Sequence, residues 1–117
     1  MKRILVLFMM VILLLPSVVS AKSLGYYTVT AYCPCRKCCG KWANGITASG
    51  VYATPDHTIA APKSFKFGQK LMINGNTYVV EDRGGSIKGR KLDIYFSDHR
   101  SALRFGKQKL EVFTVEE

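Results

Sequence analysis

Two aspartates, Asp82 and Asp93, flank a glycine-rich turn in the stretch VVEDRGGSIKGRKLDIYF at positions 79–96. Paired carboxyl groups can divide acid and base roles, because burial and a neighbouring negative charge both raise the pKa of a carboxyl group. A carboxylate inside a strand as apolar as the one around Asp93 is unusual for a solvated charge. The pattern favours a two-carboxylate site, with simple turn formation as the alternative for Asp82, since Asp side chains bond readily to their own backbone in turns.

Local periodicity predicts how this stretch folds. A first strand ends near Asp82, Gly84 and Gly85 break it, and a second strand starts at Leu92. Side chains alternate between the two faces of a strand, so Asp93 and Tyr95 should share one face while Ile94 and Phe96 occupy the other.

The remaining chain predicts further short strands and little helix. Asn74-Gly75 between two apolar runs is a hairpin signal, and residues 97–106 predict a short helix with Ser97 as N-cap and Gly106 as its end. Strands are expected at 26–32, 58–62, 70–73, 78–80, 92–96 and 110–115. Strands and helices do not alternate, so the pattern predicts an all-β domain, either a small barrel or a sandwich.

The first 21 residues have the layout of a secretory signal peptide. Lys2 and Arg3 precede an uncharged apolar run that Pro16 ends, and small residues follow at Val19-Ser20-Ala21. The run is shorter than the ~20 apolar residues of a membrane span, although an uncleaved anchor is the alternative. We therefore expect one domain over residues 22–117, secreted or held in the cell envelope, without stable membrane insertion after cleavage.

The predicted mature chain is basic. Removing Lys2 and Arg3 from the 17 basic residues leaves 15 against 8 acidic ones, a net charge of +7. Export argues against nucleic acid as the partner and favours the polyanions outside the membrane, which are cell-wall polymers and anionic lipids. Solubility alone is the other explanation of this charge.

Four cysteines crowd a short loop over residues 33–40. Cys33, Cys35, Cys38 and Cys39 form an even set in a chain predicted to be exported, which favours disulfides. A Cys38–Cys39 bridge would be strained, so two connectivities remain. A Zn²⁺ site built from the clustered thiols is the alternative; structural zinc usually joins two separated ligand pairs, whereas all four thiols lie in one loop. No other cofactor is expected.

The string EDRGGSIKGRKLDIYF resembles the signature of the 3D (three-aspartate) domain, which occurs in MltA-type lytic transglycosylases and in YuiC-like secreted cell-wall proteins. The matching residues are Asp82, Gly84, Gly85, Ile87, Lys88, Gly89 and Asp93. The resemblance covers roughly residues 27–115 and implies a six-stranded double-psi β-barrel with one short helix. One departure is clear: Ala61 stands where much of the family has its first aspartate, and Asp56 lies nearby.

The resemblance also implies an activity. A lytic transglycosylase cleaves an O-glycosyl bond of peptidoglycan, here with Asp93 as general acid and base, Asp82 as its catalytic neighbour, and no metal. The substrate contacts it implies are Thr47, Ser49, Gly50, Gly84, Gly85, Lys88 and His99. A monomer that binds glycan strands is expected, and a non-catalytic glycan-binding module is the alternative function.

Overall fold

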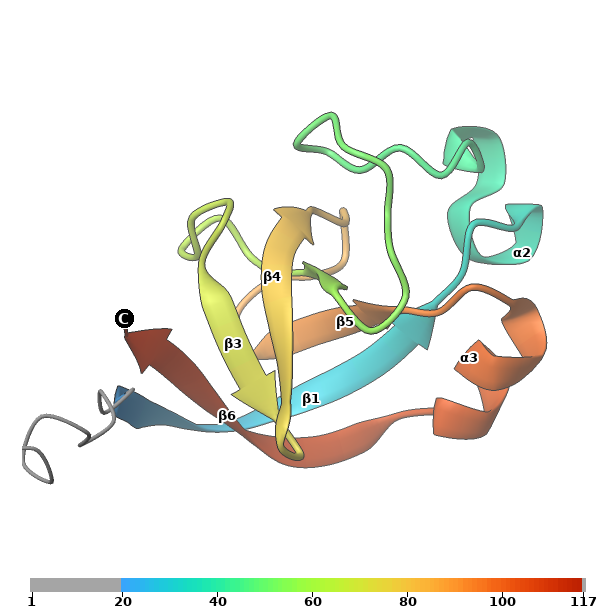
Figure 1. Cartoon of the computed structure of the whole chain (residues 1–117). Coiled ribbons are helices and arrows are strands. Elements are labelled where there is room, and N and C mark those ends of the chain that lie inside the picture. The colour runs from blue at the N-terminus through green and yellow to red at the C-terminus, as the bar shows by residue number, and fades with distance from the viewer. Residues whose placement is uncertain (1–19, 117) are drawn as a thin grey trace, which may run out of the picture.

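The computed structural model describes residues 20–116, which form a closed barrel of six strands (Figure 1). The strands are β1 (Ser20–Tyr32), β2 (Thr58–Ala60), β3 (Lys70–Ile73), β4 (Asn76–Asp82), β5 (Lys91–Tyr95) and β6 (Gln108–Glu116). Around the barrel their order is β1-β5-β2-β4-β3-β6. The predicted all-β class and the six strands are confirmed, and the double-psi description stays a prediction.

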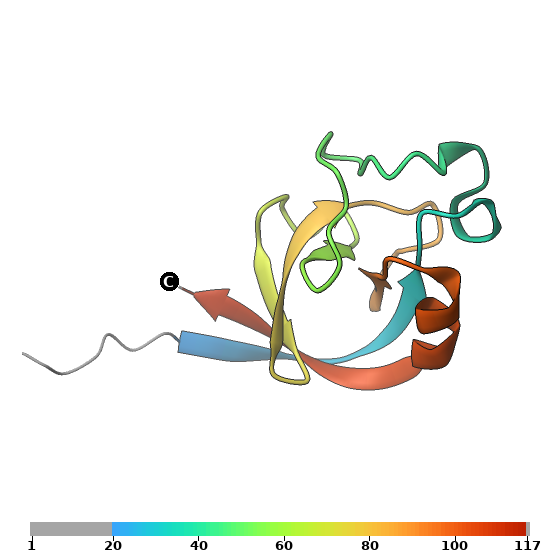
Figure 2. The ribbon, with the colours of Figure 1, turned by 45° about the vertical axis from the view of Figure 1, so that its right-hand side comes forward.

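The barrel mixes parallel and antiparallel pairs. β1 pairs with β5 in parallel and with β6 antiparallel, while β2 pairs with β4 in parallel and with β5 antiparallel. β3 closes the ring through antiparallel pairing with β4 and β6, and Figure 2 shows the closed wall from a second side. Closure pairs every strand on both edges, which removes exposed sheet edges. It also brings β1, at one end of the sequence, beside the predicted aspartate strand β5.

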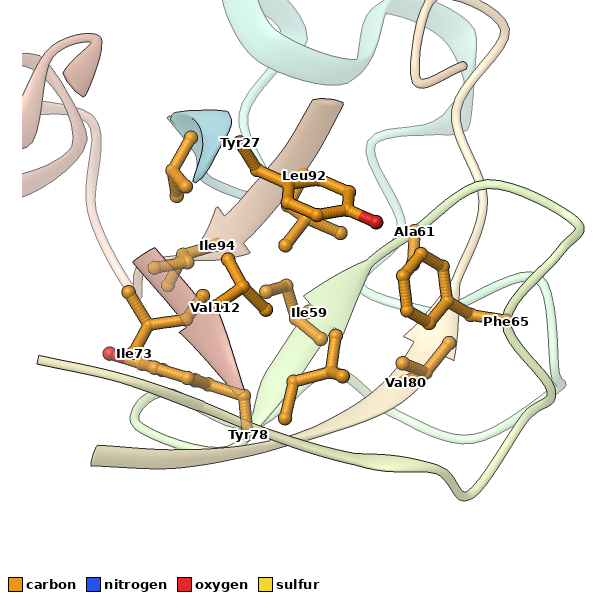
Figure 3. Close-up of a cluster of buried hydrophobic side chains, with 12 residues drawn as sticks. Tyr27, Ile59, Ala61, Phe65, Ile73, Tyr78, Val80, Leu92, Ile94 and Val112 are labelled. Atoms are coloured by element: carbon orange, nitrogen blue, oxygen red, sulfur yellow. The ribbon is translucent and has the colours of Figure 1, made fainter. Parts of the chain in front are cut away.

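One apolar cluster fills the barrel (Figure 3). Each strand alternates between side chains that enter this cluster and side chains that leave it, as the period of two requires. Its buried members are Tyr27, Val29, Ile59, Ala61, Phe65, Leu71, Ile73, Tyr78, Val80, Leu92, Ile94 and Val112. On β5 the alternation places Leu92 and Ile94 in the core and leaves Asp93 for the other face, as predicted.

The β3–β4 connection is the predicted hairpin. Asn74 and Gly75 both adopt positive φ angles, 53° and 78°. A two-residue hairpin turn of the type that matches strand twist requires this conformation, and Asn-Gly tolerates it best.

Short helices lie at one end of the barrel. α2 (Arg36–Cys39) and the 3₁₀ turn η1 (Gly40–Trp42) follow β1, and α3 (His99–Phe105) follows β5. The predicted helix starts later than expected: its N-cap is Asp98, whose carboxylate accepts the Ser101 backbone N–H, and not Ser97. Figures 1 and 2 both show α3 next to the segment that carries α2.

The predicted signal peptide falls on residues 1–19, outside the described residues, and on Ser20 and Ala21, which begin β1. Ser20 pairs with Glu116 of β6, and the β1–β6 pairing shifts register between Ser23 and Gly25. Within residues 20–116, none of the helices has the length and apolar character needed to cross a membrane.

Candidate functional site

A cleft of about 610 Å³ opens where the ends of β1, β4 and β5 meet the loops after β1 and β4. It is lined by Tyr32, Pro34, Cys38, Cys39, Asn44, Gly45, Ile46, Thr47, Ala48, Ala53, Ala60, Asp82, Arg83, Gly84, Gly85, Ser86, Ile87, Asp93 and Tyr95. Both signature aspartates are in this lining. The charged groups among these lining residues are therefore two carboxylates and one guanidinium.

Strand register explains why the two aspartates meet. On β2, Ala60 pairs with Asp93 of β5 on one side and with Asp82 of β4 on the other. Neighbouring strands lie ~4.8 Å apart, so the backbones of the two aspartates are separated by about 10 Å. Ala60 forms the floor of the cleft between the two aspartates, and its small methyl group fills little of the space there. Ala60, Asp82 and Asp93 all line the cleft, so this floor is open to it.

The Asp93 carboxyl group is partly buried, and this burial changes its pKa. Burial raises the pKa of its carboxyl group from 3.8 to about 6, and the nearby negative charge of Asp82 adds to the rise. The Thr30 hydroxyl opposes this effect, because it donates a hydrogen bond of 2.8 Å to Asp93 Oδ1. Thr30 and Asp93 face each other across the β1–β5 pair. A carboxyl group with this pKa is available both as a proton donor and as a proton acceptor near neutral pH.

Asp82 is held by several donors. Its Oδ2 accepts the Tyr32 hydroxyl at 2.7 Å, and its Oδ1 accepts the backbone N–H groups of Ala48 and Arg83, each at 2.9 Å. Burial, followed by the hydrogen bond to Asp82, raises the pKa of Tyr32 far above its ordinary value. Asp82 thus joins β1, the loop at Ala48 and the turn that follows β4. Its carboxylate has a structural task in addition to any chemical one.

The turn after Asp82 forms one wall of the cleft. The Ile87 N–H donates to the Gly84 carbonyl at 3.0 Å, and a Cβ on Gly84 would lie 2.9 Å from Ile87 Cγ1. This close approach requires glycine. A Cβ on Gly85 would meet nothing within 4 Å, so the backbone there borders open space. The Arg83 guanidinium donates to the carbonyls of Ala61 and Phe65, at 3.3 and 2.6 Å, and so ties this turn to the β2–β3 connection.

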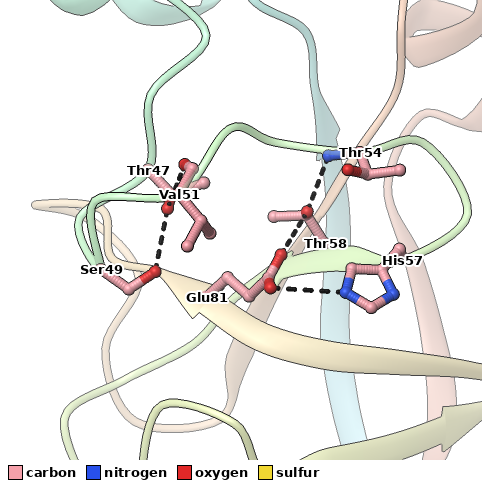
Figure 4. A network of polar contacts seen from close by, with 7 residues as sticks. All are labelled: Thr47, Ser49, Val51, Thr54, His57, Thr58 and Glu81. Carbon is pink, nitrogen blue, oxygen red and sulfur yellow. Dashed lines mark hydrogen bonds and ion pairs between the residues drawn. The ribbon is translucent and has the colours of Figure 1, made fainter.

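The loop at 47–51 forms the facing wall, and a polar network holds it (Figure 4). The Thr47 hydroxyl lies 3.0 Å from Ser49 Oγ and 2.8 Å from the Val51 carbonyl oxygen, to which it donates. The Ser49 N–H donates to the Glu81 carbonyl, which attaches the loop to β4. On the neighbouring strand β2 the Thr58 hydroxyl donates to the Glu81 carboxylate at 2.7 Å. Glu81, the residue before Asp82, is therefore held by hydrogen bonds from Ser49 and Thr58.

Several predicted substrate contacts lie outside the cleft lining. Thr47, Gly84 and Gly85 line the cleft, whereas Ser49 and Gly50 shape the loop behind Thr47. Lys88 is exposed beyond the glycine turn. His99 lies among the cysteines at the start of α3 and does not line the cleft.

The missing first aspartate has no replacement in the cleft lining. Ala61 is fully buried in the core cluster, next to Ala60 on the cleft floor. Asp56 adopts a positive φ of 59° in the turn before β2 and does not line the cleft.

The predicted disulfides are absent, because all four cysteines are free. Cys33 Sγ lies 2.9 Å from Cys35 Sγ and 3.3 Å from Cys38 Sγ, beyond the ~2.05 Å of a disulfide bond. Cys39 turns away, and its thiol donates to the Cys33 carbonyl at 3.2 Å. Nδ1 of His99, which comes from α3, lies 3.5 to 3.7 Å from the other three sulfurs. The loop is thus a thiol–imidazole cluster beside the cleft.

Sequence reasoning missed Tyr32, Thr30 and Ala60. Tyr32 and Tyr95 stack edge-on at 5.4 Å on the cleft wall, and Tyr32 then reaches Asp82. All three residues contact the aspartates through pairing of strands distant in sequence. The aromatic and β-branched composition of 26–32 predicted a strand, and its polar members at positions 28, 30 and 32 were the available signal.

Solved structures with a similar fold support this description. Crystal structures of MltA from E. coli match this chain with TM-scores of 0.53 and 0.54 at 23% and 24% sequence identity. The match covers 61% of this chain and 27% of the MltA chain. At this identity the likeness concerns the fold alone, and the chain spans about a quarter of MltA.

A curated relative and a family model extend the comparison. The putative cell wall shaping protein YabE of Bacillus subtilis (strain 168) is 31% identical over 87 residues, which is 71% of this chain and 21% of YabE. The model of the 3D domain matches residues 57–116, the segment that contains β2 to β6 and both cleft aspartates. The chain therefore belongs to the 3D domain family.

Proposed function

We propose that this protein is a lytic transglycosylase that cleaves O-glycosyl bonds of peptidoglycan outside the cytoplasm. The observation that carries the proposal is the Asp93 carboxyl group, which faces a cleft and has its pKa raised to about 6 by burial. Two similarities support the choice of substrate. The fold resembles that of the E. coli lytic transglycosylase MltA, and the sequence is 31% identical to that of a putative cell wall shaping protein.

In this proposal Asp93 acts twice. Its protonated carboxyl group donates a proton to the leaving glycosidic oxygen, and an oxocarbenium-like sugar develops. The substrate's own 6-hydroxyl group then attacks the anomeric carbon while the Asp93 carboxylate accepts the hydroxyl proton. Cleavage gives two fragments: one carries a new free hydroxyl group from the leaving oxygen, and the other ends in a 1,6-anhydromuramyl residue. Asp93 is protonated again. Asp82 stabilises the positive charge at the sugar and keeps the pKa of Asp93 raised.

The proposed substrate contacts are those that line the cleft. Thr47, Gly84 and Gly85 border opposite walls, and the open backbone at Gly85 allows a sugar substituent to approach closely. No role in substrate contact is assigned to Lys88, Ser49, Gly50 or His99, because they lie outside the lining.

Mass spectrometry of purified peptidoglycan after incubation with the protein tests the reaction. The proposal expects products that end in 1,6-anhydromuramic acid. Products with reducing ends would instead indicate a hydrolase on the same barrel. Boiled protein and the Asp93→Asn variant are the controls.

A glycan-binding module without catalysis is the second candidate. It is favoured by the buried Ala61 in place of the first aspartate, which leaves two carboxylates in the cleft lining, and by the short span of MltA that the chain covers. This function predicts that the folded protein sediments with insoluble peptidoglycan and releases no product.

The pH dependence of turnover follows from the raised pKa of Asp93. The first step needs the protonated carboxyl group, so kcat/KM should fall as the pH rises through about 6, approaching tenfold per pH unit above it. Initial rates on peptidoglycan from pH 4 to 8, with folding checked by circular dichroism at each pH, measure this. A rate that stays constant from pH 5 to 8 would exclude Asp93 as the acid.

The floor between the aspartates offers a steric test. Ala60→Leu places a branched side chain between Asp82 and Asp93, where Ala60 pairs with both. We expect at least about a tenfold loss of kcat/KM, and a cost in folding stability of ~1–3 kcal/mol from overpacking. Ala60→Ser, which is nearly the same size, should keep most activity. Equal losses in the two variants, measured with thermal unfolding alongside, would contradict a substrate position above Ala60.

A further inference from the structure

The cysteine loop is not used by the proposed reaction, yet its donor atoms converge. Sγ of Cys33, Cys35 and Cys38 and Nδ1 of His99 all lie within 4.8 Å of one another. Cys39, the fourth thiol, is outside this set because it donates to the Cys33 carbonyl. The cluster therefore consists of three of the four neighbouring thiols and one imidazole.

The distances within the cluster resemble a tetrahedral coordination shell. With Zn–S ~2.3 Å and Zn–N ~2.0–2.1 Å, the N–S edges of a tetrahedron are ~3.6 Å and the S–S edges ~3.8 Å. His99 Nδ1 lies 3.7, 3.5 and 3.5 Å from the sulfurs of Cys33, Cys35 and Cys38. The S–S distances of 2.9 and 3.3 Å are shorter than the edge, so an ion requires these sulfurs to separate by less than ~1 Å.

The backbone brings the donors together independently of any ion. The N–H groups of Cys38 and Cys39 both donate to the Cys35 carbonyl, at 3.2 and 2.9 Å, which folds the Cys35-x-x-Cys38 segment into one turn. The Phe96 N–H donates to the Tyr32 carbonyl at 2.7 Å and aligns the ends of β1 and β5. Cys33 and His99 follow these two ends. The ligands therefore come from two segments, as in structural zinc sites.

A metal accounts for the cluster better than the alternatives. A disulfide would use two of the three sulfurs and leave the third and the imidazole without a covalent or ionic partner. A Cys–His nucleophile would need one thiol and would leave two unused, one of them the buried Cys33. Three thiolates and one imidazole form a complete zinc ligand set with no open position for water, which is typical of a structural site.

We infer that Cys33, Cys35, Cys38 and His99 bind one Zn²⁺ ion, which joins the cysteine loop to the start of α3. The same loop supplies Pro34, Cys38 and Cys39 to the cleft lining, so the ion fixes one wall of the cleft. The site is a structural one, and its occupancy does not depend on the proposed reaction.

Metal content and Co²⁺ spectroscopy on the purified full chain, kept reduced, test the site. One zinc per chain is expected, and Co²⁺ should give thiolate charge-transfer bands and intense tetrahedral d–d bands. His99→Ala and Cys38→Ser each remove a ligand and should weaken Co²⁺ binding by more than the ~10–100-fold that loss of an outer-shell partner costs. Cys39→Ser and His57→Ala are the matched controls and should bind as the wild type does, because His57 lies 3.4 Å from the Glu81 carboxylate, outside the cluster. His99→Cys, which replaces one ligand by another, should keep binding and shows that loss in His99→Ala is not misfolding.

Alkylation distinguishes a metal from a disulfide. In zinc-loaded protein iodoacetamide should modify Cys39 alone, and all four cysteines should react after chelation in denaturant without added reductant, which also exposes the buried Cys33. Two thiols that stay blocked after chelation, or equal loss of Co²⁺ binding in Cys39→Ser and Cys38→Ser, would overturn the inference.

Discussion

Asp93→Asn is expected to reduce peptidoglycan cleavage by about 10³-fold or more, because the amide can neither donate a proton to the glycosidic oxygen nor accept one from the 6-hydroxyl. The substitution keeps the size of the side chain, and Asn Oδ1 still accepts the Thr30 hydroxyl that bonds Asp93 at 2.8 Å. Binding to insoluble peptidoglycan should therefore persist. Product release by the variant at more than a tenth of the wild-type rate would remove Asp93 from the mechanism.

The same variant should be more stable than the wild type at neutral pH. The folded pKa of Asp93, about 6, lies above the ordinary value of 3.8, so its contribution to stability is fully present below about pH 4 and is lost as the pH rises through 6. An Asn side chain stays neutral at every pH, so the variant has no buried charge that would destabilise the fold above pH 6. We expect a gain of at most about 3 kcal/mol in the free energy of unfolding at pH 7.5, shrinking toward zero near pH 4.

Urea unfolding of both proteins at the two pH values measures this difference. Thr30→Val is a matched control, because it removes the hydrogen bond that lowers the pKa of Asp93 and leaves the carboxyl group in place. Thr30→Val should move the falling limb of the pH–rate profile to higher pH. A stability gain in Asp93→Asn that is equal at pH 4 and 7.5 would contradict the burial argument.

Local periodicity allowed much of the barrel to be predicted from the sequence. Alternation along 92–96 correctly put Asp93 and Tyr95 on the cleft face and Ile94 in the core, since side-chain alternation is a property of a single strand. The Asn74-Gly75 turn was correct for the same local reason.

The contacts of the site depend on pairing between distant segments, which no local pattern encodes. Thr30 reaches Asp93 across 63 positions, and His99 reaches Cys35 across 64. The prediction of disulfides was wrong because it considered the four thiols alone, whereas in the structure the imidazole Nδ1 of His99, from α3, lies beside three of them. The predicted helix 97–106 gave no sign that its first turn would meet the cysteine loop.

Asp82→Ala should damage the site in a different way, through the structure. Its carboxylate accepts the Tyr32 hydroxyl and the N–H groups of Ala48 and Arg83, and its removal leaves these donors without a partner. Deleting one partner of a charged hydrogen bond costs ~1.5–3 kcal/mol, so we expect the free energy of unfolding to fall by about 2–4 kcal/mol in total. Turnover and peptidoglycan binding should both decline, because two cleft walls lose their anchor. Tyr32→Phe removes one of the three bonds and should show a smaller loss.

Asp82→Asn separates the charge of this residue from its bonds. Asn Oδ1 still accepts the N–H groups of Ala48 and Arg83, while the negative charge that helps to raise the pKa of Asp93 is gone. The falling limb of the pH–rate profile should therefore move to lower pH, by less than about one unit because burial is the larger cause of the shift. Asp82→Asn should also be more stable than Asp82→Ala. A profile that keeps its midpoint while kcat falls would assign Asp82 to stabilising the sugar cation, and an unchanged profile with unchanged kcat would leave it a positioning residue.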